Sequence, residues 1–133
     1  MKKLFISLLF LVGCVLTTHA QQDNKGDVLV KGDKIPSFEL NRKGERINSA
    51  NLKGKVVALV FFATWCPPCQ KELADIEKTL WPELKDNKQF LLLTVGREHT
   101  DEELATYNEK KGFTFPLYPD KDRGVYSLFA TQY

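Results

Sequence analysis

The hydrophobic pattern of the chain contains two long apolar runs that predict strands. One run covers residues 55–63, and the other extends from Phe90 to Val95. Both are apolar at consecutive positions, which is typical of strands that are buried on both faces. We therefore expect 55–63 to be the central strand of a sheet, covered by helices on both sides, with the second run as a neighbour.

Helical periodicity follows each apolar run. After the first run, apolar residues recur at spacings of four, three, four and four and form one stripe: Cys69, Leu73, Ile76, Leu80 and Leu84. Pro82 lies inside this pattern and should break or kink the helix near Leu80 and Trp81. After the second run, residues 100–103 (Thr-Asp-Glu-Glu) fit a capping box, and Gly112 should end the helix that they open.

Shorter patterns complete the predicted fold. Residues 36–40 predict a strand, 41–44 a turn and 46–48 the partner strand. Residues 113–119 should be extended, and 122–130 should form a short helix. The order strand, helix, strand, helix predicts an α/β layer fold with parallel strands. A chain of 133 residues is long enough for one such domain.

The first twenty residues have the pattern of a secretion signal. Two lysines precede an apolar stretch that runs to Leu16, and Ala20 occupies the small-residue position of a cleavage site. A transmembrane anchor is the less favoured interpretation, because the stretch is shorter than the ~20 residues that span a bilayer. We therefore divide the chain into a signal peptide (1–20), a flexible leader (21–34) and a folded domain (35–133).

Cys14 leaves a second interpretation of this region open. Residues 11–14 (Leu-Val-Gly-Cys) resemble a bacterial lipobox, in which Cys14 would carry a lipid anchor. The apolar region continues past Cys14, which favours cleavage after Ala20 instead. In both cases the chain is directed to the periplasm or cell envelope, and Cys14 is not a redox partner of the other two cysteines.

Charge is balanced beyond the signal. Residues 21–133 contain 17 basic and 17 acidic side chains, because the signal holds two lysines and no acidic residue. A nucleic-acid-binding protein would need a basic face, so we expect no such partner. An exported compartment is oxidising, and a single cysteine pair there forms a disulfide unless another protein reduces it.

The two remaining cysteines lie in the motif Cys66-Pro67-Pro68-Cys69, directly after the first apolar run. A strand would deliver the pair to an edge of the fold, and the prolines would start a helix there. Cysteines this close interconvert between dithiol and disulfide with little backbone movement, which is the chemistry of thiol-disulfide exchange. Cys66, at the helix cap, should be the exposed attacking thiolate, favoured by the helix dipole and by free N–H groups of Cys69 and Gln70. Cys69, on the apolar stripe, should resolve the mixed disulfide.

Two other uses of a cysteine pair compete with redox chemistry. A purely structural disulfide across four residues would close a very small loop and contribute little to stability. Zinc needs four ligands, typically a second cysteine pair or two histidines, and beyond the signal the chain has only His99. We therefore favour redox chemistry and expect neither a metal nor another cofactor.

Residues 61–73, Phe-Phe-Ala-Thr-Trp-Cys-Pro-Pro-Cys-Gln-Lys-Glu-Leu, resemble the active-site segment of TlpA/ResA-like thiol-disulfide oxidoreductases. These are exported relatives of thioredoxin within the redoxin group. Residues 32–40 are similar to the opening strand of that group, and the resemblance extends from about Gly32 to Ala130. It implies a thioredoxin-like α/β fold with a central, mostly parallel sheet. It also implies protein thiols and disulfides of the cell envelope as partners, with a membrane electron donor upstream.

The resemblance assigns roles within the motif. Cys66 matches the nucleophile, and Cys69 matches the resolving cysteine. Pro68 matches the proline that moderates the redox potential. Trp65 and Pro67 complete the motif and shape it.

Glu72 has two equally good interpretations. It matches an acidic residue proposed to help proton transfer in the ResA-like branch, and it also fits an ordinary exposed position on a helix. A helix places it three residues after Cys69, on an adjacent face. Cytosolic thioredoxins bury an aspartate six residues before the first cysteine. Val60 stands there in this chain, so that proton relay is absent.

The last part of the chain departs from the family pattern. Thioredoxin-like folds continue with a cis-proline that faces the cysteine pair, then a hairpin and a final helix. Pro116 and Pro119 come too early for this role. The chain therefore resembles a C-terminally truncated member that lacks the C-terminal strands and helix, and we expect it to be marginally stable and poorly active by itself.

Two alternatives to an active oxidoreductase stay open. A peroxiredoxin-like peroxidase belongs to the same redoxin group, but it needs a Thr-x-x-Cys pattern, and Thr64 lies two residues before Cys66. An inactive truncated fragment is the other alternative. Peroxide consumption would distinguish the first of these, and near-UV circular dichroism would test the second.

Overall fold

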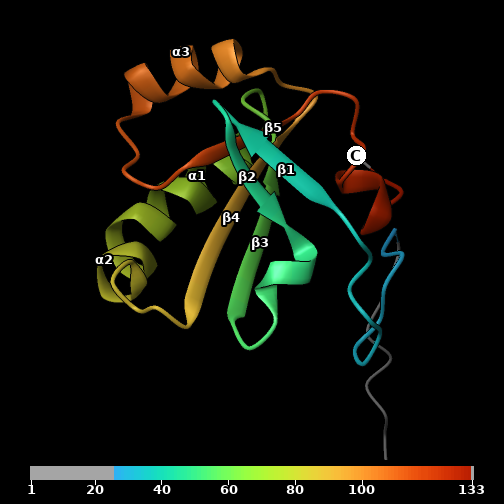
Figure 1. The fold of residues 1–133 in the computed structure, drawn as a ribbon. Helices are drawn as coiled ribbons and strands as arrows, with labels where there is room; N and C mark the ends of the chain where they lie inside the picture. The colour runs from blue at the N-terminus through green and yellow to red at the C-terminus, as the bar shows by residue number, and fades with distance from the viewer. Residues whose placement is uncertain (1–25, 133) are drawn as a thin grey trace, which may run out of the picture.

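The computed structural model describes residues 26–132 (Figure 1). The predicted signal peptide, Cys14 and the first residues of the leader lie outside the described residues. The described part contains five strands, three α-helices and short 3-10 and π-helical turns. In this part of the chain, no helix is both long enough and apolar enough to cross a membrane.

Three parallel strands form the main sheet: β3 (Val56–Phe62), β4 (Phe90–Arg97) and β5 (Leu117–Asp120). Their order is β3-β4-β5, so β4 lies in the centre, and β3 lies at an edge among the described residues. The expected pairing of 55–63 with the second apolar run is therefore confirmed, but the expectation that 55–63 is central is wrong for this part of the chain. Both runs are apolar on both faces, and that pattern does not specify which of them gains the second neighbour.

The burial of the two strands agrees with this order. Residues 92–97 of β4 are all buried, whereas β3 is half-buried along most of its length. β3 pairs with β4 from Val56 opposite Phe90 to Phe62 opposite Gly96. β5 pairs with only the second half of β4. Because the strands are parallel, their carboxyl ends lie at the same end of the sheet, and the cysteine motif follows β3 there.

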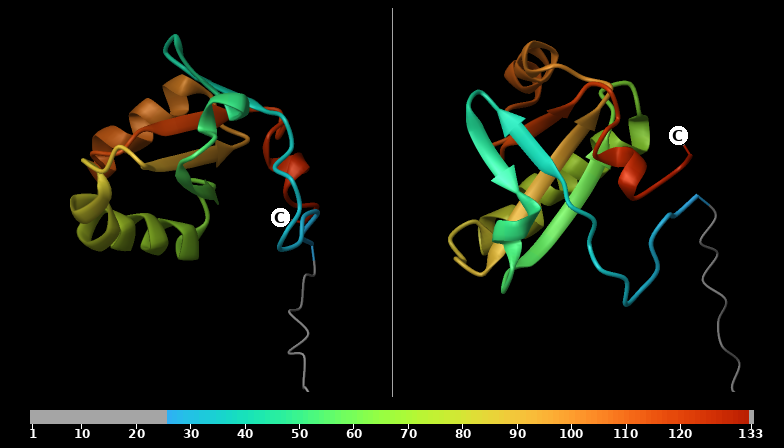
Figure 2. Two further views of the ribbon diagram at one scale, coloured as in Figure 1. Left: turned by 60° about the horizontal axis from the view of Figure 1, so that its bottom comes forward. Right: turned by 45° about the vertical axis from the view of Figure 1, so that its right-hand side comes forward.

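Helices cover one face of the sheet. α1 (Pro67–Asp75) and α3 (Asp101–Lys111) contribute Leu73 and Leu104 to a cluster that also contains Leu92 of β4. Figure 2 shows α1 and the β1–β2 hairpin on opposite sides of the sheet. This layer fixes the start of α1, and with it the cysteine motif, against the sheet edge.

A β-hairpin and the C-terminal segment cover the opposite face. β1 (Glu39–Arg42) and β2 (Glu45–Asn48) pair antiparallel, as predicted, with bounds shifted by a few residues. Apolar residues of this layer, with others from the 3-10 turn region, pack on Leu93 and Val95. The expectation of helices on both faces is wrong, because short extended and 3-10 segments supply the apolar side chains on this side.

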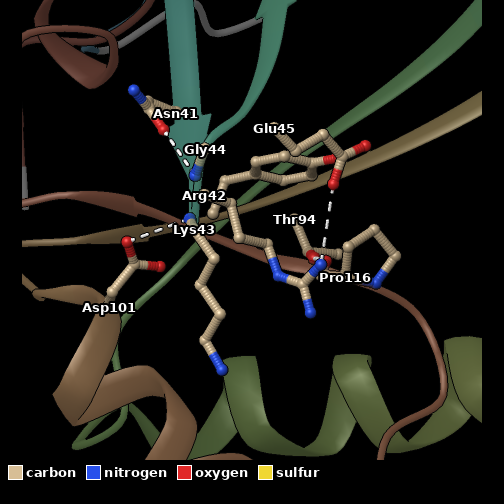
Figure 3. A network of polar contacts seen from close by, with 9 residues as sticks. Asn41, Arg42, Lys43, Gly44, Glu45, Thr94, Asp101 and Pro116 are labelled. Atoms are coloured by element: carbon tan, nitrogen blue, oxygen red, sulfur yellow. Dashed lines mark hydrogen bonds and ion pairs between the residues drawn. The ribbon is translucent and has the colours of Figure 1, made fainter.

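The hairpin tip is bound to the first turn of α3 (Figure 3). Lys43 and Gly44 close the hairpin with positive φ angles of 48° and 87°. The Gly44 N–H donates to Asn41 Oδ1 at 3.3 Å, and the Lys43 N–H donates to Asp101 Oδ2 at 3.3 Å. An ion pair of 3.6 Å joins Arg42 Nη1 to Glu45 Oε2. Of these contacts, the hydrogen bond from Lys43 to Asp101 connects the hairpin to α3 at one end of the sheet.

Pro82 disturbs the helix after the motif without ending it. The chain passes from α1 through a π-helical turn, η2 (Ile76–Leu80), into α2 (Trp81–Leu84). The Trp81 N–H donates to the Ile76 carbonyl, five residues earlier. Proline has no N–H, and its ring needs room near the carbonyl four residues before it. One wide turn supplies that room, so the predicted disturbance near Trp81 takes the form of a π turn.

The capping box of α3 is confirmed. Thr100 Oγ1 accepts the Glu103 N–H at 3.2 Å, and Glu103 Oε2 accepts the Thr100 N–H at 2.8 Å. Gly112, with φ of 71°, ends the helix in the left-handed conformation. Both ends of α3 therefore agree with the sequence.

The last predicted helix is much shorter than expected. Residues 122–130 contain only the 3-10 turn η3 (Tyr126–Leu128). The buried Asp120 carboxylate accepts the N–H groups of Val125 at 3.1 Å and Tyr126 at 2.8 Å. The Asp120 side chain holds the loop in a turn. The apolar residues after it pack on the sheet and do not form the apolar face of a longer helix.

Candidate active site

The two cysteines of the motif are joined by a disulfide at the start of α1. Cys66 and Cys69 have Cα atoms 5.3 Å apart. Cys66 is the N-cap of the helix, in an extended conformation, and Pro67 and Pro68 occupy the first two helical positions. Proline fits these positions because its missing N–H would have no intrahelical acceptor there. The structure thus brings the predicted pair to the predicted place.

Hydrogen bonds fix the backbone around Cys66. Its N–H donates to the Ala63 carbonyl at 3.1 Å, and its carbonyl accepts the Gln70 N–H at 3.0 Å. The Gln70 N–H is therefore not a free donor, contrary to expectation, because it closes the first helical turn. Cys66 and Cys69 are both half-buried, and Cys69 also packs against the core cluster that contains Leu73.

A buried histidine supports the loop that leads into the motif. The Thr64 N–H donates to His99 Nε2 at 3.0 Å, and Gln70 Nε2 donates to the Thr64 carbonyl at 2.6 Å. His99 is buried, and its Nδ1 lies 3.7 Å from Glu103 Oε2. Since Nε2 accepts a hydrogen bond, the ring proton resides on Nδ1 and faces the carboxylate. The sequence pattern indicated His99 only as a possible metal ligand and gave no sign of this role.

The Glu103 carboxylate connects this support to the helix cap. The Thr100 backbone N–H lowers the pKa of Glu103 most, and His99 contributes to the same direction. The carboxylate is therefore ionised at neutral pH and serves both the cap of α3 and the histidine. Glu103 thereby connects the start of α3, through His99, to Thr64 in the loop before Cys66.

A groove of about 500 Å³ lies beside the disulfide. It is lined by two cysteines, one charged residue and five apolar or aromatic residues: Phe61, Trp65, Cys66, Pro67, Pro68, Cys69, Arg97 and Tyr126. Trp65 is 61% exposed and forms an outer wall. The motif prolines and Trp65, which the sequence predicts to shape the site, thus line this groove.

Arg97 is the charged residue of the groove. It ends β4 and is only 6% exposed. Its guanidinium carbon lies 5.2 Å from the centre of the Trp65 ring and 5.3 Å from that of Tyr126. Sequence reasoning missed both Arg97 and Tyr126. The only indication in the sequence was that Arg97, a cation, stands at the carboxyl end of a predicted apolar strand.

Glu72 and Val60 lie outside the groove. Glu72 is exposed on α1 and does not line it. Val60 packs against the core cluster below the motif, at the position where an aspartate would sit in cytosolic thioredoxins. Among residues 26–132, no group of three or more histidine, cysteine or acidic side chains is arranged to hold a metal ion.

Sequence comparison places this site among known redox proteins. The model of the AhpC/TSA family matches residues 31–132. The thiol-disulfide oxidoreductase ResA of Oceanobacillus iheyensis is 31% identical over 130 residues, covering 92% of this chain and 66% of the relative. The thioredoxin-like protein YneN of Bacillus subtilis is 32% identical over 119 residues, covering 87% and 69%. The chain thus spans about two thirds of the length of these relatives.

Solved structures show the same fold. A candidate protein disulfide isomerase from Bacteroides thetaiotaomicron superposes with a TM-score of 0.75 at 33% identity, covering 80% of this chain and 67% of that one. The thioredoxin domain of a thiol-disulfide oxidoreductase from Bacteroides vulgatus gives 0.61 at 25% identity, covering 75% and 71%. These likenesses confirm the predicted thioredoxin-like α/β fold and the resemblance to thiol-disulfide oxidoreductases.

Proposed function

Because the chain belongs to the AhpC/TSA family and carries a Cys66–Cys69 disulfide at a helix start, we propose that it is a thiol-disulfide oxidoreductase. The proposed reaction reduces protein disulfides through the Cys-Pro-Pro-Cys dithiol. The observation that carries the proposal is the position of the pair, half-buried at the start of α1 beside an open groove.

The proposed reaction has two exchange steps. The Cys66 thiolate attacks one sulfur of the substrate disulfide, so a mixed disulfide forms and the other substrate sulfur leaves as a thiolate that takes up a proton. The Cys69 thiolate then attacks the Cys66 sulfur and releases the second substrate thiol. Two electrons pass to the substrate, and the enzyme ends as the Cys66–Cys69 disulfide. A dithiol donor upstream, which we place at the membrane, must reduce it again.

The order of the two cysteines can be tested by alkylation and substitution. In the reduced protein, Cys66 should react with iodoacetamide faster than Cys69, because it caps the helix whereas Cys69 packs against the core. Cys66→Ser should abolish reduction of a protein disulfide, and Cys69→Ser should accumulate the mixed disulfide. Equal alkylation rates would contradict this order. Peroxide consumption without disulfide reduction would instead favour the peroxidase alternative.

We also propose that Glu72 assists proton transfer between the cysteines. It lies three residues after Cys69 on the same helix, where its exposed carboxylate can exchange protons with water. Glu72→Gln should change the pH dependence of the exchange rate and leave thermal stability unaltered. If the pH–rate profile stays the same, Glu72 is an ordinary surface residue.

The proposed site of action is the periplasm or cell envelope, with protein thiols and disulfides as partners. The predicted signal at residues 1–20 supports this location. Mass spectrometry of the exported protein should find Gln21 at the N-terminus. A diacylglyceryl group on Cys14 would show a membrane-anchored lipoprotein instead and would leave the redox proposal intact. A mature chain that retains residues 1–20 in the cytoplasm would refute this location.

A further inference from the structure

Among residues 26–132, the guanidinium of Arg97 has neither a hydrogen bond nor an ion pair, and its Nη1 is buried without an acceptor. The residue is 94% buried. Buried charges are normally paired, because removing a charge from water is energetically unfavourable. An unpaired, buried cation is therefore a feature that needs a physical explanation.

Two aromatic rings compensate for part of this cost. The guanidinium contacts the Trp65 and Tyr126 rings at 5.2 and 5.3 Å from their centres. A cation–π contact is stronger when the cation is removed from water, as it is here. The rings hold the guanidinium in place but do not accept its in-plane N–H groups. Nη1 is enclosed, and the other N–H donors of the guanidinium have no acceptor among residues 26–132. A planar guanidinium with free donors can bind a carboxylate through two parallel hydrogen bonds.

Arg97 also determines the charge of the groove beside the disulfide. Of the eight residues that line the groove, it is the only charged one. The guanidinium carbon of a second arginine, Arg123, lies 4.8 Å from the centre of the same tyrosine ring, but Glu98 pairs with it at 3.5 Å and it does not line the groove. The net result is one uncompensated positive charge between apolar walls, next to the disulfide.

From this arrangement we propose that Arg97, Trp65 and Tyr126 form a subsite for a carboxylate of the substrate. The preferred substrates are peptide or protein disulfides in which an acidic residue lies next to the cysteine that Cys66 attacks. The carboxylate binds the Arg97 guanidinium, and the apolar parts of the same segment lie on the prolines and Trp65. The inference rests on the proposed function, since it specifies which disulfides the site selects.

The test uses disulfide-linked peptides that differ at one position. The residue next to the cystine is Glu in one peptide and Gln in the other, and kcat/KM for reduction is measured for both. For the wild-type chain we expect a Glu/Gln ratio of about 10, mainly from KM, that declines with added salt. In Arg97→Met the ratio should fall to about 1. Arg123→Met, the matched control at the same tyrosine, should keep the ratio.

A binding measurement separates this inference from the proposed function. Titration of the oxidised protein with each peptide in reduced, S-methylated form should shift the Trp65 indole N–H resonance more for Glu than for Gln, and Arg97→Met should remove the difference. Binding with this preference but no reduction would refute the proposed function and support the subsite. Reduction and binding without preference would overturn the subsite. The pH dependence of Cys66 alkylation gives a third readout. If Arg97→Met changes that pH profile but leaves the Glu/Gln ratio intact, Arg97 acts on the thiolate, and the subsite is overturned.

Discussion

At the scale of single residues, the site depends on polar side chains that the core holds in place. His99 is buried beneath the loop that precedes the disulfide, and it accepts the Thr64 N–H at 3.0 Å. The guanidinium carbon of Arg97, two residues earlier in the chain, lies 5.2 Å from the centre of the Trp65 ring. Both follow the apolar core of β4, so one strand end supplies two supports for the cysteine pair.

Removal of the His99 ring should loosen the loop before Cys66. In His99→Ala, the part-buried Thr64 N–H loses its acceptor, which costs about 1–3 kcal/mol. We expect a lower Tm and faster hydrogen exchange of the Thr64 amide in the oxidised protein, measured by NMR. Lys110→Ala, an exposed change on α3, serves as the control. Unchanged protection of the Thr64 amide would show that the hydrogen bond contributes nothing.

At the scale of elements, α3 is defined at both ends by its own sequence. Its capping box involves residues three positions apart, and its last turn contains Lys110 and Lys111 before Gly112. Cations near the C-terminal end and acids near the N-terminal end interact favourably with the helix dipole and so stabilise the helix. The helix after the motif differs, because Pro82 conflicts with the local pattern. It continues only through a π turn, where Trp81 stays packed edge-on against Phe115.

The cap of α3 should make stability depend on pH in the acid range. Folding lowers the pKa of Glu103 below its ordinary value of 4.5, because the folded state holds the carboxylate on the Thr100 N–H. Its stabilising effect is therefore fully present above pH 4.5 and is lost as the pH falls through the lower, folded value. Glu103→Gln should be less stable than wild type at pH 7, and the difference should shrink at pH 3, as measured by urea unfolding.

Thr100→Ala is the companion to that experiment. It removes the acceptor for the Glu103 N–H, which typically costs about 1 kcal/mol. Because no titrating group is removed, its destabilisation should vary less with pH than that of Glu103→Gln. Equal pH dependence in the two variants would contradict the assignment of the acid-sensitive contribution to the Glu103 carboxylate.

At the scale of the whole molecule, a close approach between α3 and the sheet determines the packing of one layer. Gly96 of β4 faces Leu104, which is 2% exposed in the core of that layer. A Cβ at position 96 would lie 2.7 Å from Leu104 Cδ2 and 3.0 Å from Cδ1. Gly96 therefore sets how near α3 lies to the strand end that carries Arg97 and leads into His99.

Gly96→Ala should force this layer apart. Overpacking of a closed core costs about 1–3 kcal/mol, and we expect that loss in the free energy of unfolding. The double variant with Leu104→Ala should lose less than the sum of the two single changes, because the smaller side chain makes room. Gly124→Ala is the matched control, since its Cβ would meet no atom closer than 3.8 Å. Strict additivity of the two changes would refute the predicted contact.

The amino-acid sequence by itself determined the features that depend on neighbours within a few residues. The capping box of α3, the hairpin of β1 and β2, and the start of α1 at Pro67 were all predictable. Each rests on hydrogen bonds or backbone preferences within one turn. The cysteine motif belongs to this group, because two residues of spacing and a helix start already specify its chemistry.

Only the tertiary structure decided how distant segments meet. Two equally apolar runs could each have been central, and the pairing of β5 with β4 placed β4 there. Tyr126, which follows β5, lies against the Arg97 guanidinium, and the same guanidinium lies against Trp65. Hydrophobic periodicity records whether a residue is buried but not against which partner. The cation in the redox groove and the histidine beneath the motif therefore emerge only once strands far apart in the sequence lie side by side.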